Sequence, residues 1–373
     1  MALVYRGILA SPFAQAVGRI TAIMLAVSTV LVGAALLIGY TAPNHYLLFV
    51  GQTHSEWAED VFLHDLDQAI TRNLTHSQYV FDFDPMWSRD GARAAFRRGG
   101  SDVCVLETPG IHSHCLSLSA FENGVVDVFI IGWLAGSAHL ALYVLDSTAD
   151  VYFTVIDVQN GSLLRQRWER ELHGTLYNRV GSLSPDGSTL LGVRFVAGDS
   201  QLIAAPIDDI NAFTPLSPPE VDASYPSWSP DGSQIAYIGY SYSPARFDLF
   251  AVNADGSGER LIASDVSTVL PEIIWSTDGE TVLFASNAGD GDFEVYAVDL
   301  GAAMVNPPRT LTDNGELDSN PQVSPDGEWI AYESAEDTRC GYTQLFLKRI
   351  DGTDKRQLTY GCGSYFNPVW QPQ

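Results

Sequence analysis

The chain has 373 residues, of which 46% are hydrophobic and 11% aromatic, and this apolar content excludes an intrinsically disordered protein. It carries 20 basic and 45 acidic residues, a formal net charge of −25. Residues 1–40 contain only two basic residues, Arg6 and Arg19, and no acidic residue, so the remaining chain is more acidic still. Such a surface repels phosphate backbones, and we expect no nucleic-acid partner.

The first predicted element is an uncharged apolar segment, ITAIMLAVSTVLVGAALLIGY, over residues 20–40. At about 1.5 Å per residue, a helix of this length spans roughly 30 Å, the hydrocarbon thickness of a bilayer. We therefore expect a single transmembrane helix here, acting as a signal anchor in the cell membrane. A cleaved signal peptide is the alternative, and it would export the same downstream residues.

The orientation of this helix follows from the charges around it. Arg6 and Arg19 precede the apolar segment, and no further charge occurs before Glu56. The positive-inside rule then places residues 1–19 in the cytoplasm and the chain beyond the helix on the extracytoplasmic side, periplasmic or extracellular. Residues 41–45 form a short linker before the first predicted strand.

Four cysteines follow the apolar segment, an even number that is typical of an exported, disulfide-bonded chain. Cys104 and Cys115 flank Pro109-Gly110 symmetrically. A two-residue hairpin turn there would place the two cysteines opposite each other on adjacent strands, where a disulfide can close. Zinc is the alternative, because His112 and His114 lie beside Cys115.

One short pattern recurs along the rest of the chain, as in YPSWSPDGSQIAY from Tyr225. The proline fixes φ for a turn, the aspartate caps turn amides and the glycine takes a positive φ, so the pattern indicates a structural hairpin. Its glycines recur 45 to 48 residues apart after Gly187, and the preceding gap of 96 predicts one degenerate copy near Trp133. The residues assigned this structural role are Trp87, Asp90, Gly91, Trp133, Asp186, Gly187, Trp228, Asp231, Gly232, Trp275, Asp278, Gly279, Asp326, Gly327 and Trp370.

Each copy is followed by a second pattern, as in DLFAVNADGSGERLIA from Asp248, so one repeat supplies four strands, A to D. Four strands in a period of 45 to 50 residues are typical of a β-propeller blade. The chain from residue 46 supplies three strands, and FNPVWQPQ at the C-terminal end supplies the missing A strand. We predict an all-β propeller over residues 46–373, with seven four-stranded blades closed by the C-terminal strand joining the first blade. Six blades are the alternative.

The repeated WSPDG…IAY…LF…DG…RQLT pattern resembles the PD40 (WD40-like) β-propeller repeat of the TolB family, over residues 46–373. The resemblance implies a propeller that binds other proteins, often in a cell-envelope assembly. This chain departs from TolB in that the apolar segment stands where TolB has an α/β domain. The prolyl oligopeptidase group has similar blades followed by a hydrolase domain, which we do not expect here.

Sequence motifs of catalysis are missing: the chain has no G-x-S-x-G elbow, P-loop, H-E-x-x-H pair or full EF-hand loop. We therefore expect no enzyme, no catalytic residue and no required cofactor. The eight histidines all fall in the N-terminal half, whereas a lyase resembling the oligogalacturonate lyases would need histidines converging on a metal in the central channel. NAGDGDFE from Asn287 is rich in oxygen ligands, and Asp290, Asp292 and Glu294 are weak calcium candidates.

Alternating strand directions place the A–B and C–D turns on one face, which we call the turn face, and the B–C and D–A loops on the other, the loop face. Longer and more varied loops on a rigid scaffold are where binding residues concentrate, and tyrosine and arginine are common interface anchors. The candidate partner-binding residues on the loop face are Tyr240, Tyr242, Arg246, Arg339 and Tyr342. Cys340 and Cys362 fall on the same face of one blade and are candidates for a second disulfide.

The sequence therefore predicts a membrane-anchored, extracytoplasmic propeller that acts as a protein-binding scaffold or accessory subunit of an envelope complex. The short linker would hold it beside an integral-membrane or envelope protein partner. A propeller-fold enzyme or carbohydrate-binding protein that uses the central channel is the alternative. The oligomeric state has no signal in the sequence.

Overall fold

The structure, a computed structural model, describes residues 46–52, 58–107, 112–116, 118, 124–168, 182–196, 199–219, 221–242, 245–266, 269–288, 291–301, 307–336 and 341–372. The chain divides into two units, Met1–Asn44 and His45–Gln373. The predicted cytoplasmic segment, transmembrane helix and linker lie outside the described residues. Within the described ranges, no helix has the length and apolar character needed to cross a membrane.

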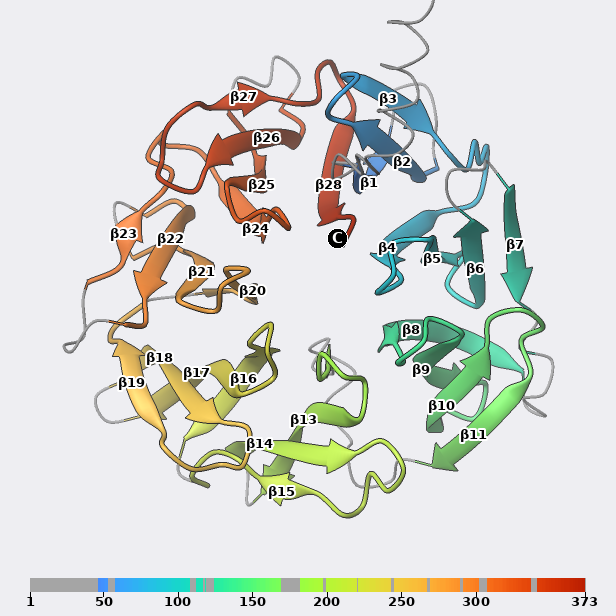
Figure 1. Cartoon of the computed structure of the whole chain (residues 1–373), viewed down its shortest axis with the longest axis horizontal. Helices are drawn as coiled ribbons and strands as arrows, with labels where there is room; N and C mark the ends of the chain where they lie inside the picture. Colours follow the sequence, from blue (N-terminus) through green and yellow to red (C-terminus); the bar gives the residue numbers. More distant parts are fainter. Residues whose placement is uncertain are drawn as a thin grey trace, which may run out of the picture. The chain divides into compact units, whose positions relative to one another are not determined.

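Seven antiparallel four-stranded sheets form a ring, with strand A of each blade nearest the centre (Figure 1). The seven-bladed prediction is confirmed, and the six-bladed alternative is wrong. Blade 1 consists of β28 (Ser364–Trp370), β1 (Tyr46–Gln52), β2 (Asp60–Asp65) and β3 (Ile70–Asn73). Blade 2 consists of β4 (Asp82–Trp87), β5 (Arg93–Arg98), β6 (Asp102–Glu107) and β7 (His112–Leu116). Blade 3 consists of β8 (Val125–Trp133), β9 (His139–Asp146), β10 (Val151–Asp157) and β11 (Leu163–Trp168).

The remaining four blades follow in chain order. Blade 4 consists of β12 (Ser182–Leu183), β13 (Thr189–Val196), β14 (Asp199–Pro206) and β15 (Thr214–Pro215). Blade 5 consists of β16 (Asp222–Trp228), β17 (Gln234–Tyr242), β18 (Ala245–Asn253) and β19 (Arg260–Ala263). Blade 6 consists of β20 (Val269–Trp275), β21 (Thr281–Ser286), β22 (Glu294–Asp299) and β23 (Arg309–Thr310). Blade 7 consists of β24 (Asp318–Val323), β25 (Trp329–Ser334), β26 (Gln344–Arg349) and β27 (Arg356–Gln357).

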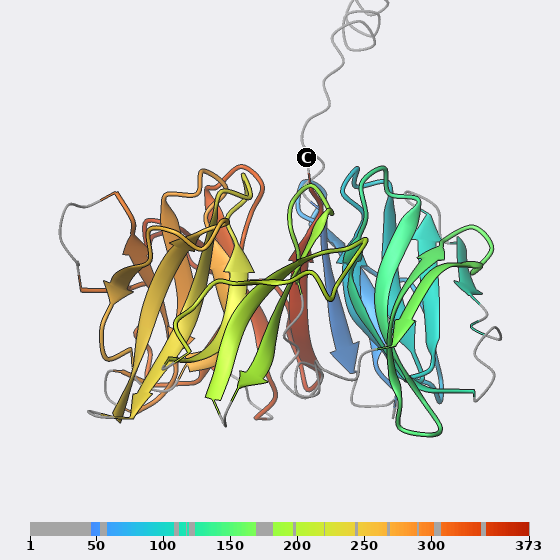
Figure 2. The same ribbon diagram turned by 90° about the horizontal axis from the view of Figure 1, so that it is seen from below.

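The ring closes between the two ends of the propeller sequence, as predicted. Strand β28 pairs antiparallel with β1, with Trp370 opposite Leu47, and the Gln371 N–H donates to the Tyr46 carbonyl at 2.9 Å. Tyr46 begins a B strand and Gln371 follows an A strand, so both lie at the turn face; Figure 2 shows the C-terminal end on one side of the ring. Closure gives the inner edge of β1 a partner, so that this edge is not open to pair with another chain.

The recurring Ser-x-Asp-Gly hairpin has the structural role that its composition predicts. In blade 5, Asp231 Oδ1 accepts the Ser229 hydroxyl at 2.7 Å and the Ser233 N–H at 3.0 Å, and Gly232 has a φ of 73°. The Ser229 hydroxyl oxygen in turn accepts the Gln234 N–H at 2.9 Å. These bonds occupy turn groups that would otherwise face water, and they fix the hairpin that starts each blade.

The apolar core lies between neighbouring blades. Leu191 and Leu202 of blade 4 pack in one cluster with Ile235 and Tyr237 of blade 5, and none of the four side chains is solvent-exposed. Full burial of such a side chain contributes about 1.5–3 kcal/mol. The degenerate copy packs in the same way, because Trp133 is 3% exposed in a cluster shared by blades 2 and 3. The prediction of a hidden blade there is confirmed.

Candidate functional site

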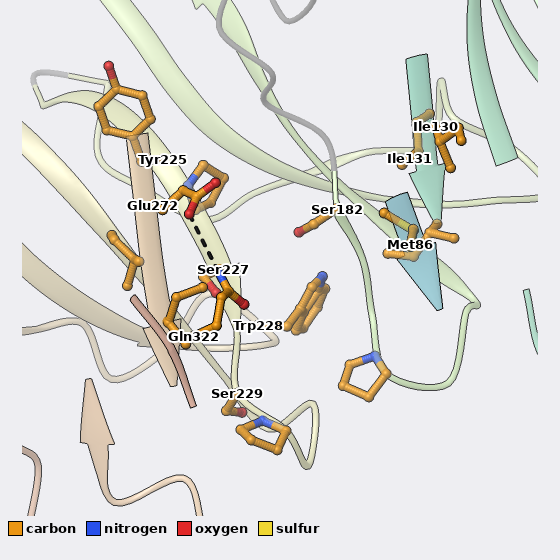
Figure 3. Close-up of a pocket in the computed structure, with 16 residues that line it drawn as sticks. Met86, Ile130, Ile131, Ser182, Tyr225, Ser227, Trp228, Ser229, Glu272 and Gln322 are labelled. Carbon is orange, nitrogen blue, oxygen red and sulfur yellow. Dashed lines mark hydrogen bonds between the residues drawn. The ribbon is translucent and has the colours of Figure 1, made fainter. Parts of the chain in front are cut away.

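A cavity of about 580 Å³ lies at the centre of the ring, lined by A-strand residues of six blades (Figure 3). These blades contribute, among others, Met86, Ile130, Ser182, Trp228, Glu272 and Gln322. The lining is therefore mixed: apolar side chains on one part of the wall, and amide, carboxylate and hydroxyl groups on the other. Concave sites of this size and mixture are typical of ligand-binding pockets.

Tryptophans at the ends of the A strands join neighbouring blades by a repeated hydrogen bond. In four blades the indole N–H donates to a main-chain carbonyl of the preceding blade. The acceptor is the residue just before the position that the tryptophan itself occupies in the repeat. The four pairs are Trp87 to Val369 (3.2 Å), Trp133 to Met86 (3.2 Å), Trp275 to Ser227 (3.1 Å) and Trp370 to Gln322 (2.9 Å). This ladder ties successive blades together around the channel.

The ladder is interrupted at blade 4, and the cavity lies at the interruption. Strand β12 is described over Ser182–Leu183, and the Trp228 indole N–H has no acceptor among the described residues. The Ser182 hydroxyl is also buried without a partner, and in the view of Figure 3 the Trp228 nitrogen is turned toward Ser182. A buried donor without a partner costs about 1–3 kcal/mol. A ligand with one acceptor and one donor would satisfy both groups, the Trp228 indole N–H and the Ser182 hydroxyl.

Four A strands carry the same bulge next to the channel. The residue before a proline has a positive φ at Asp84 (52°), Tyr225 (51°), Asn320 (50°) and Asn367 (52°), and strand register shifts there. Bulges of this kind re-aim side chains and are common near binding sites. Tyr225 lines the cavity directly.

A buried arginine holds the bulge of blade 2. Arg97 is 5% exposed; its Nη1 donates to Asp84 Oδ2 at 2.9 Å and its Nη2 donates to Asp127. Its guanidinium lies 4.4 Å from the ring centroids of both Phe83 and Phe129. The charge is thus neutralised by two carboxylates and held between two aromatic faces, a rigid arrangement that joins blades 2 and 3.

A carboxylate takes the corresponding position in blade 7. Glu333 Oε1 accepts the Asn320 side-chain amide at 2.7 Å and the Asn367 N–H at 2.8 Å. Burial raises the pKa of Glu333, and these hydrogen bonds partly offset the rise. Nearby, the Gln322 amide donates to Glu272 at 3.5 Å, as drawn in Figure 3. The channel therefore presents amides and carboxylates that can bind main-chain groups of a peptide.

The loop face carries most of the exposed large apolar side chains. Among the described residues ten such side chains are exposed, and only Ile70 and Leu164 lie at the turn face. The eight on the loop face are Tyr79 (86%), Val80 (40%), Phe81 (45%), Val126 (54%), Tyr242 (60%), Leu317 (44%), Tyr342 (38%) and Tyr360 (68%). Apolar groups gathered on one face mark an interaction surface.

The predicted partner-binding residues differ in their exposure and contacts. Tyr242 and Tyr342 are exposed, whereas Tyr240 packs between Tyr242 and Phe247 at centroid distances of 4.9 and 4.8 Å. Arg246 donates to Asp248 Oδ2 at 2.7 Å. Arg339 lies outside the described residues.

The sequence analysis missed Tyr79, Phe81 and Tyr360. All three fall in D–A connections, where aromatic residues without strand periodicity were the available signal.

The cysteine prediction is confirmed for the first pair. Strands β6 and β7 place Cys104 opposite Cys115, and a disulfide joins them, so the zinc alternative is wrong. Cys362 is also disulfide-bonded, while Cys340 lies outside the described residues.

The calcium candidates have different positions. Asp290 lies outside the described residues, Asp292 precedes β22, and Glu294 begins β22 with 4% exposure. In the part of the chain that the structure describes, no three His, Cys, Asp or Glu side chains gather closely enough to hold a metal ion by themselves.

Residues 202–373 match the PD40 family, the TolB beta propeller domain. Two proteins of related sequence are the TolB homolog of Chlorobium luteolum, 30% identical over 168 residues, and the uncharacterized peptidase YuxL of Bacillus subtilis, 27% identical over 147 residues. The matches cover 45% and 39% of this chain, but only 36% of that TolB homolog and 20% of that peptidase.

Solved structures of the same fold include TolB from Acinetobacter baumannii, with 16% identity, a TM-score of 0.53 and coverage of 88% of this chain and 67% of that one. Oligogalacturonate lyase from Vibrio parahaemolyticus has 13% identity and a TM-score of 0.63, over 80% of this chain and 85% of that one. A prolyl endopeptidase has 13% identity and a TM-score of 0.62, over 87% of this chain and 49% of that one. The fold is a TolB-like PD40 propeller, as the repeat pattern predicts.

These matches correct one expectation. We expected no enzyme because no catalytic motif occurs in the chain. That expectation is wrong, since the proteins that share this fold or part of this sequence include peptidases and a lyase. The lack of a catalytic motif in this chain therefore does not distinguish it from propellers that are part of an enzyme.

Proposed function

We propose that this TolB-like PD40 propeller is a protein-docking module, which binds a partner across its loop face and takes a segment of that partner into the central cavity. The observation that carries the proposal is the distribution of exposed apolar side chains, eight of ten on the loop face. Exposed aromatic residues are common anchors of protein interfaces.

The central cavity supports the same proposal. Its unpartnered Trp228 indole and Ser182 hydroxyl match the carbonyl and N–H groups of a peptide main chain, and Glu272 and Gln322 add acceptors and donors on the opposite wall. A peptide of mixed composition fits a lining of this kind better than a phosphate does, because a chain of net charge −25 repels anions.

We place the module on the extracytoplasmic side of the cell membrane, in an envelope complex with an integral-membrane or envelope partner. The apolar segment at residues 20–40 and the Cys104–Cys115 disulfide support this location, since disulfides persist in oxidising compartments. Tyr46, the first described residue, lies at the turn face, on the side of the ring opposite the loop face.

The test is co-purification of the full-length chain from membranes solubilised in mild detergent, with partners identified by mass spectrometry. Changing Tyr79 and Tyr242 together to serine should remove the partner, because both are exposed anchors on the loop face. Ile70→Ser with Leu164→Ser is the matched control, since these side chains are similarly exposed at the turn face. Loss of the partner in the control but not in the first variant would refute the loop-face assignment.

A second candidate is a propeller that serves an enzyme by selecting its substrate. The sequence match to the peptidase YuxL favours it. Peptide hydrolysis and cleavage of oligogalacturonate by the purified chain would be assayed directly. If the wild-type chain turns over a substrate and Trp228→Ala abolishes the turnover, the result supports this role. If Trp228→Ala leaves the turnover unchanged, the activity lies outside the central cavity.

A further inference from the structure

Two junctions between neighbouring blades are built with the same hydrogen bonds. Between blades 1 and 2, the Asp82 N–H donates to the Glu59 carbonyl at 2.8 Å, and the Val61 N–H donates to the Thr75 hydroxyl at 3.1 Å. Between blades 6 and 7, the corresponding bonds are Asp318 to Phe293 at 2.7 Å and Val295 to Thr312 at 2.8 Å. Asp60 and Asp82 of the first junction therefore correspond to Glu294 and Asp318 of the second.

In the first junction an arginine neutralises the two acids. Arg98 Nε donates to Asp82 Oδ1 at 2.7 Å, and Arg98 Nη2 donates to Asp82 Oδ2 at 2.8 Å. The charges of Asp82 and Asp60 both raise the pKa of Arg98, the hydrogen bond to Asp82 most of all. Asp60 and Asp82 are 1% and 0% exposed, so the guanidinium makes the burial of both carboxylates tolerable.

The second junction keeps the acids and lacks the arginine. Ser334 lies opposite Asp318 in the sheet, as Arg98 lies opposite Asp82. Glu294 and Asp318 are 4% and 0% exposed. Asn314 satisfies one oxygen of each, its N–H donating to Glu294 Oε1 at 3.0 Å and its amide to Asp318 Oδ2 at 2.8 Å. Glu294 Oε2 and Asp318 Oδ1 are buried, and neither has a donor in hydrogen-bonding geometry among the residues that the structure describes.

A third buried oxygen lies in the same interface, because Tyr332 of blade 7 packs in one cluster with Val295, the residue after Glu294. Tyr332 is 0% exposed, and its hydroxyl has no partner. Burial, and then the neighbouring carboxylates with Asp318 first among them, raise the pKa of this phenol. The nearby lysine, Lys355, is paired with Glu336 at the edge of the cluster. Three unpartnered oxygens from three strands thus lie in the junction of blades 6 and 7. The pairing of Lys355 with Glu336 leaves Glu294 and Asp318 without a bonded basic side chain among the described residues.

We propose that a calcium ion binds in this junction, coordinated by Glu294 Oε2, Asp318 Oδ1 and the Tyr332 hydroxyl. The ion links blades 6 and 7 as Arg98 links blades 1 and 2. Calcium prefers carboxylate and neutral oxygen ligands in flexible geometry, and its charge balances the two acids. Burial raises the pKa of Asp318 to about 7, and the Ser334 and Thr312 hydroxyls, which lie near this carboxylate, partly offset the rise. The two hydroxyls are further oxygen ligands at hand.

The experiment measures thermal unfolding of the full-length chain in mild detergent, after treatment with a chelator, with and without 1 mM CaCl₂. We expect calcium to raise the wild-type Tm by about 1–2 °C, the shift that about 1 kcal/mol of binding free energy produces when the unfolding entropy scales with the length of the propeller. The same concentration of MgCl₂ controls for ionic strength. Isothermal titration should give one calcium ion per chain.

Two variants decide whether the response comes from this site. Asp318→Asn should abolish the calcium response, because it removes a ligand and one of the two charges. Ser334→Arg should abolish it as well while keeping the stability of the calcium-loaded wild type, because it supplies the guanidinium found in the first junction. Asp82→Asn, at the equivalent acid of that junction, should keep the response.

Three outcomes overturn the proposal. A wild-type chain that calcium does not stabilise, and whose stability falls as the pH rises past 7, has a proton rather than calcium between Glu294 and Asp318. A calcium response that survives in both Asp318→Asn and Ser334→Arg comes from elsewhere in the chain. A calcium response that is lost in Asp82→Asn depends on the first junction instead.

Discussion

Trp275 donates its indole N–H to the carbonyl of Ser227 at 3.1 Å, whereas Trp228, its equivalent one blade earlier, has no acceptor. We expect Trp275→Phe to lower the free energy of unfolding by about 1 kcal/mol more than Trp228→Phe does, because only the first change removes a hydrogen bond. Urea unfolding followed by circular dichroism measures both. Equal losses would show that the indole ladder adds nothing beyond packing.

The Cys104–Cys115 disulfide should stabilise the chain mainly by restricting its unfolded state. The two residues are 11 apart in sequence, and closing a loop of this length is worth about 3 kcal/mol in the chain-entropy model. A Cys104→Ala/Cys115→Ala double variant should therefore unfold at a lower urea concentration than the oxidised protein. As the control, a reducing agent should have a smaller effect on this variant than on the wild type, since the variant retains only the bond that involves Cys362.

The hairpin aspartates should make stability sensitive to acid. The Ser184 and Ser229 hydroxyls, with turn N–H groups, lower the pKa values of Asp186 and Asp231 to about 2, whereas an aspartate in the unfolded chain titrates near about 3.9. The stabilisation is complete above pH 4, and it is lost as the pH falls from about 4 to 2. Thermal unfolding between pH 2 and 5 should show this slope, and Asp231→Asn should make the slope shallower; an unchanged slope would argue against Asp231.

Arg97 should be costly to remove because it is buried between charges and rings. Arg97→Ala would leave Asp84 and Asp127 facing each other without a cation and open a gap between Phe83 and Phe129. We expect a loss of about 2–3 kcal/mol, below the largest values for buried pairs because both carboxylates are partly hydrated. Denaturant unfolding provides the measurement. Arg194→Ala is the control and should cost less, because Arg194 also lies over a phenylalanine but donates to the neutral side chain of Gln201.

Much of the fold was predictable because blade formation here depends on local turn chemistry that repeats. Each Asp-Gly turn contains its own hydrogen-bond partners within five residues, so Gly91, Gly187 and Gly232 mark their hairpins without knowledge of the rest of the chain. The same holds for Cys104 and Cys115, whose pairing follows from the symmetry of one hairpin.

The candidate sites were harder to predict because they depend on which blades meet. Arg97 and Asp127, which form an ion pair, are 30 residues apart in the sequence. The strand register is also needed to see that Ser334 takes beside Asp318 the position that Arg98 takes beside Asp82. The cavity is lined by residues of six blades, so no single repeat indicates it. The expectation of no enzyme was wrong because it depended on missing catalytic motifs. Such motifs report the chemistry of one chain segment, and they do not tell whether a propeller of this fold belongs to an enzyme.

The hydrogen bond from Gln371 to Tyr46 has a practical consequence for handling the protein. It brings the C-terminal end to the face opposite the exposed tyrosines, so a biosensor surface coupled through an added C-terminal tag would present Tyr79 and Tyr242 to the solution. Coupling through lysines would be less uniform, because Lys355 is already ion-paired. Directional immobilisation by the C terminus is therefore the geometry in which a search for binding partners should begin.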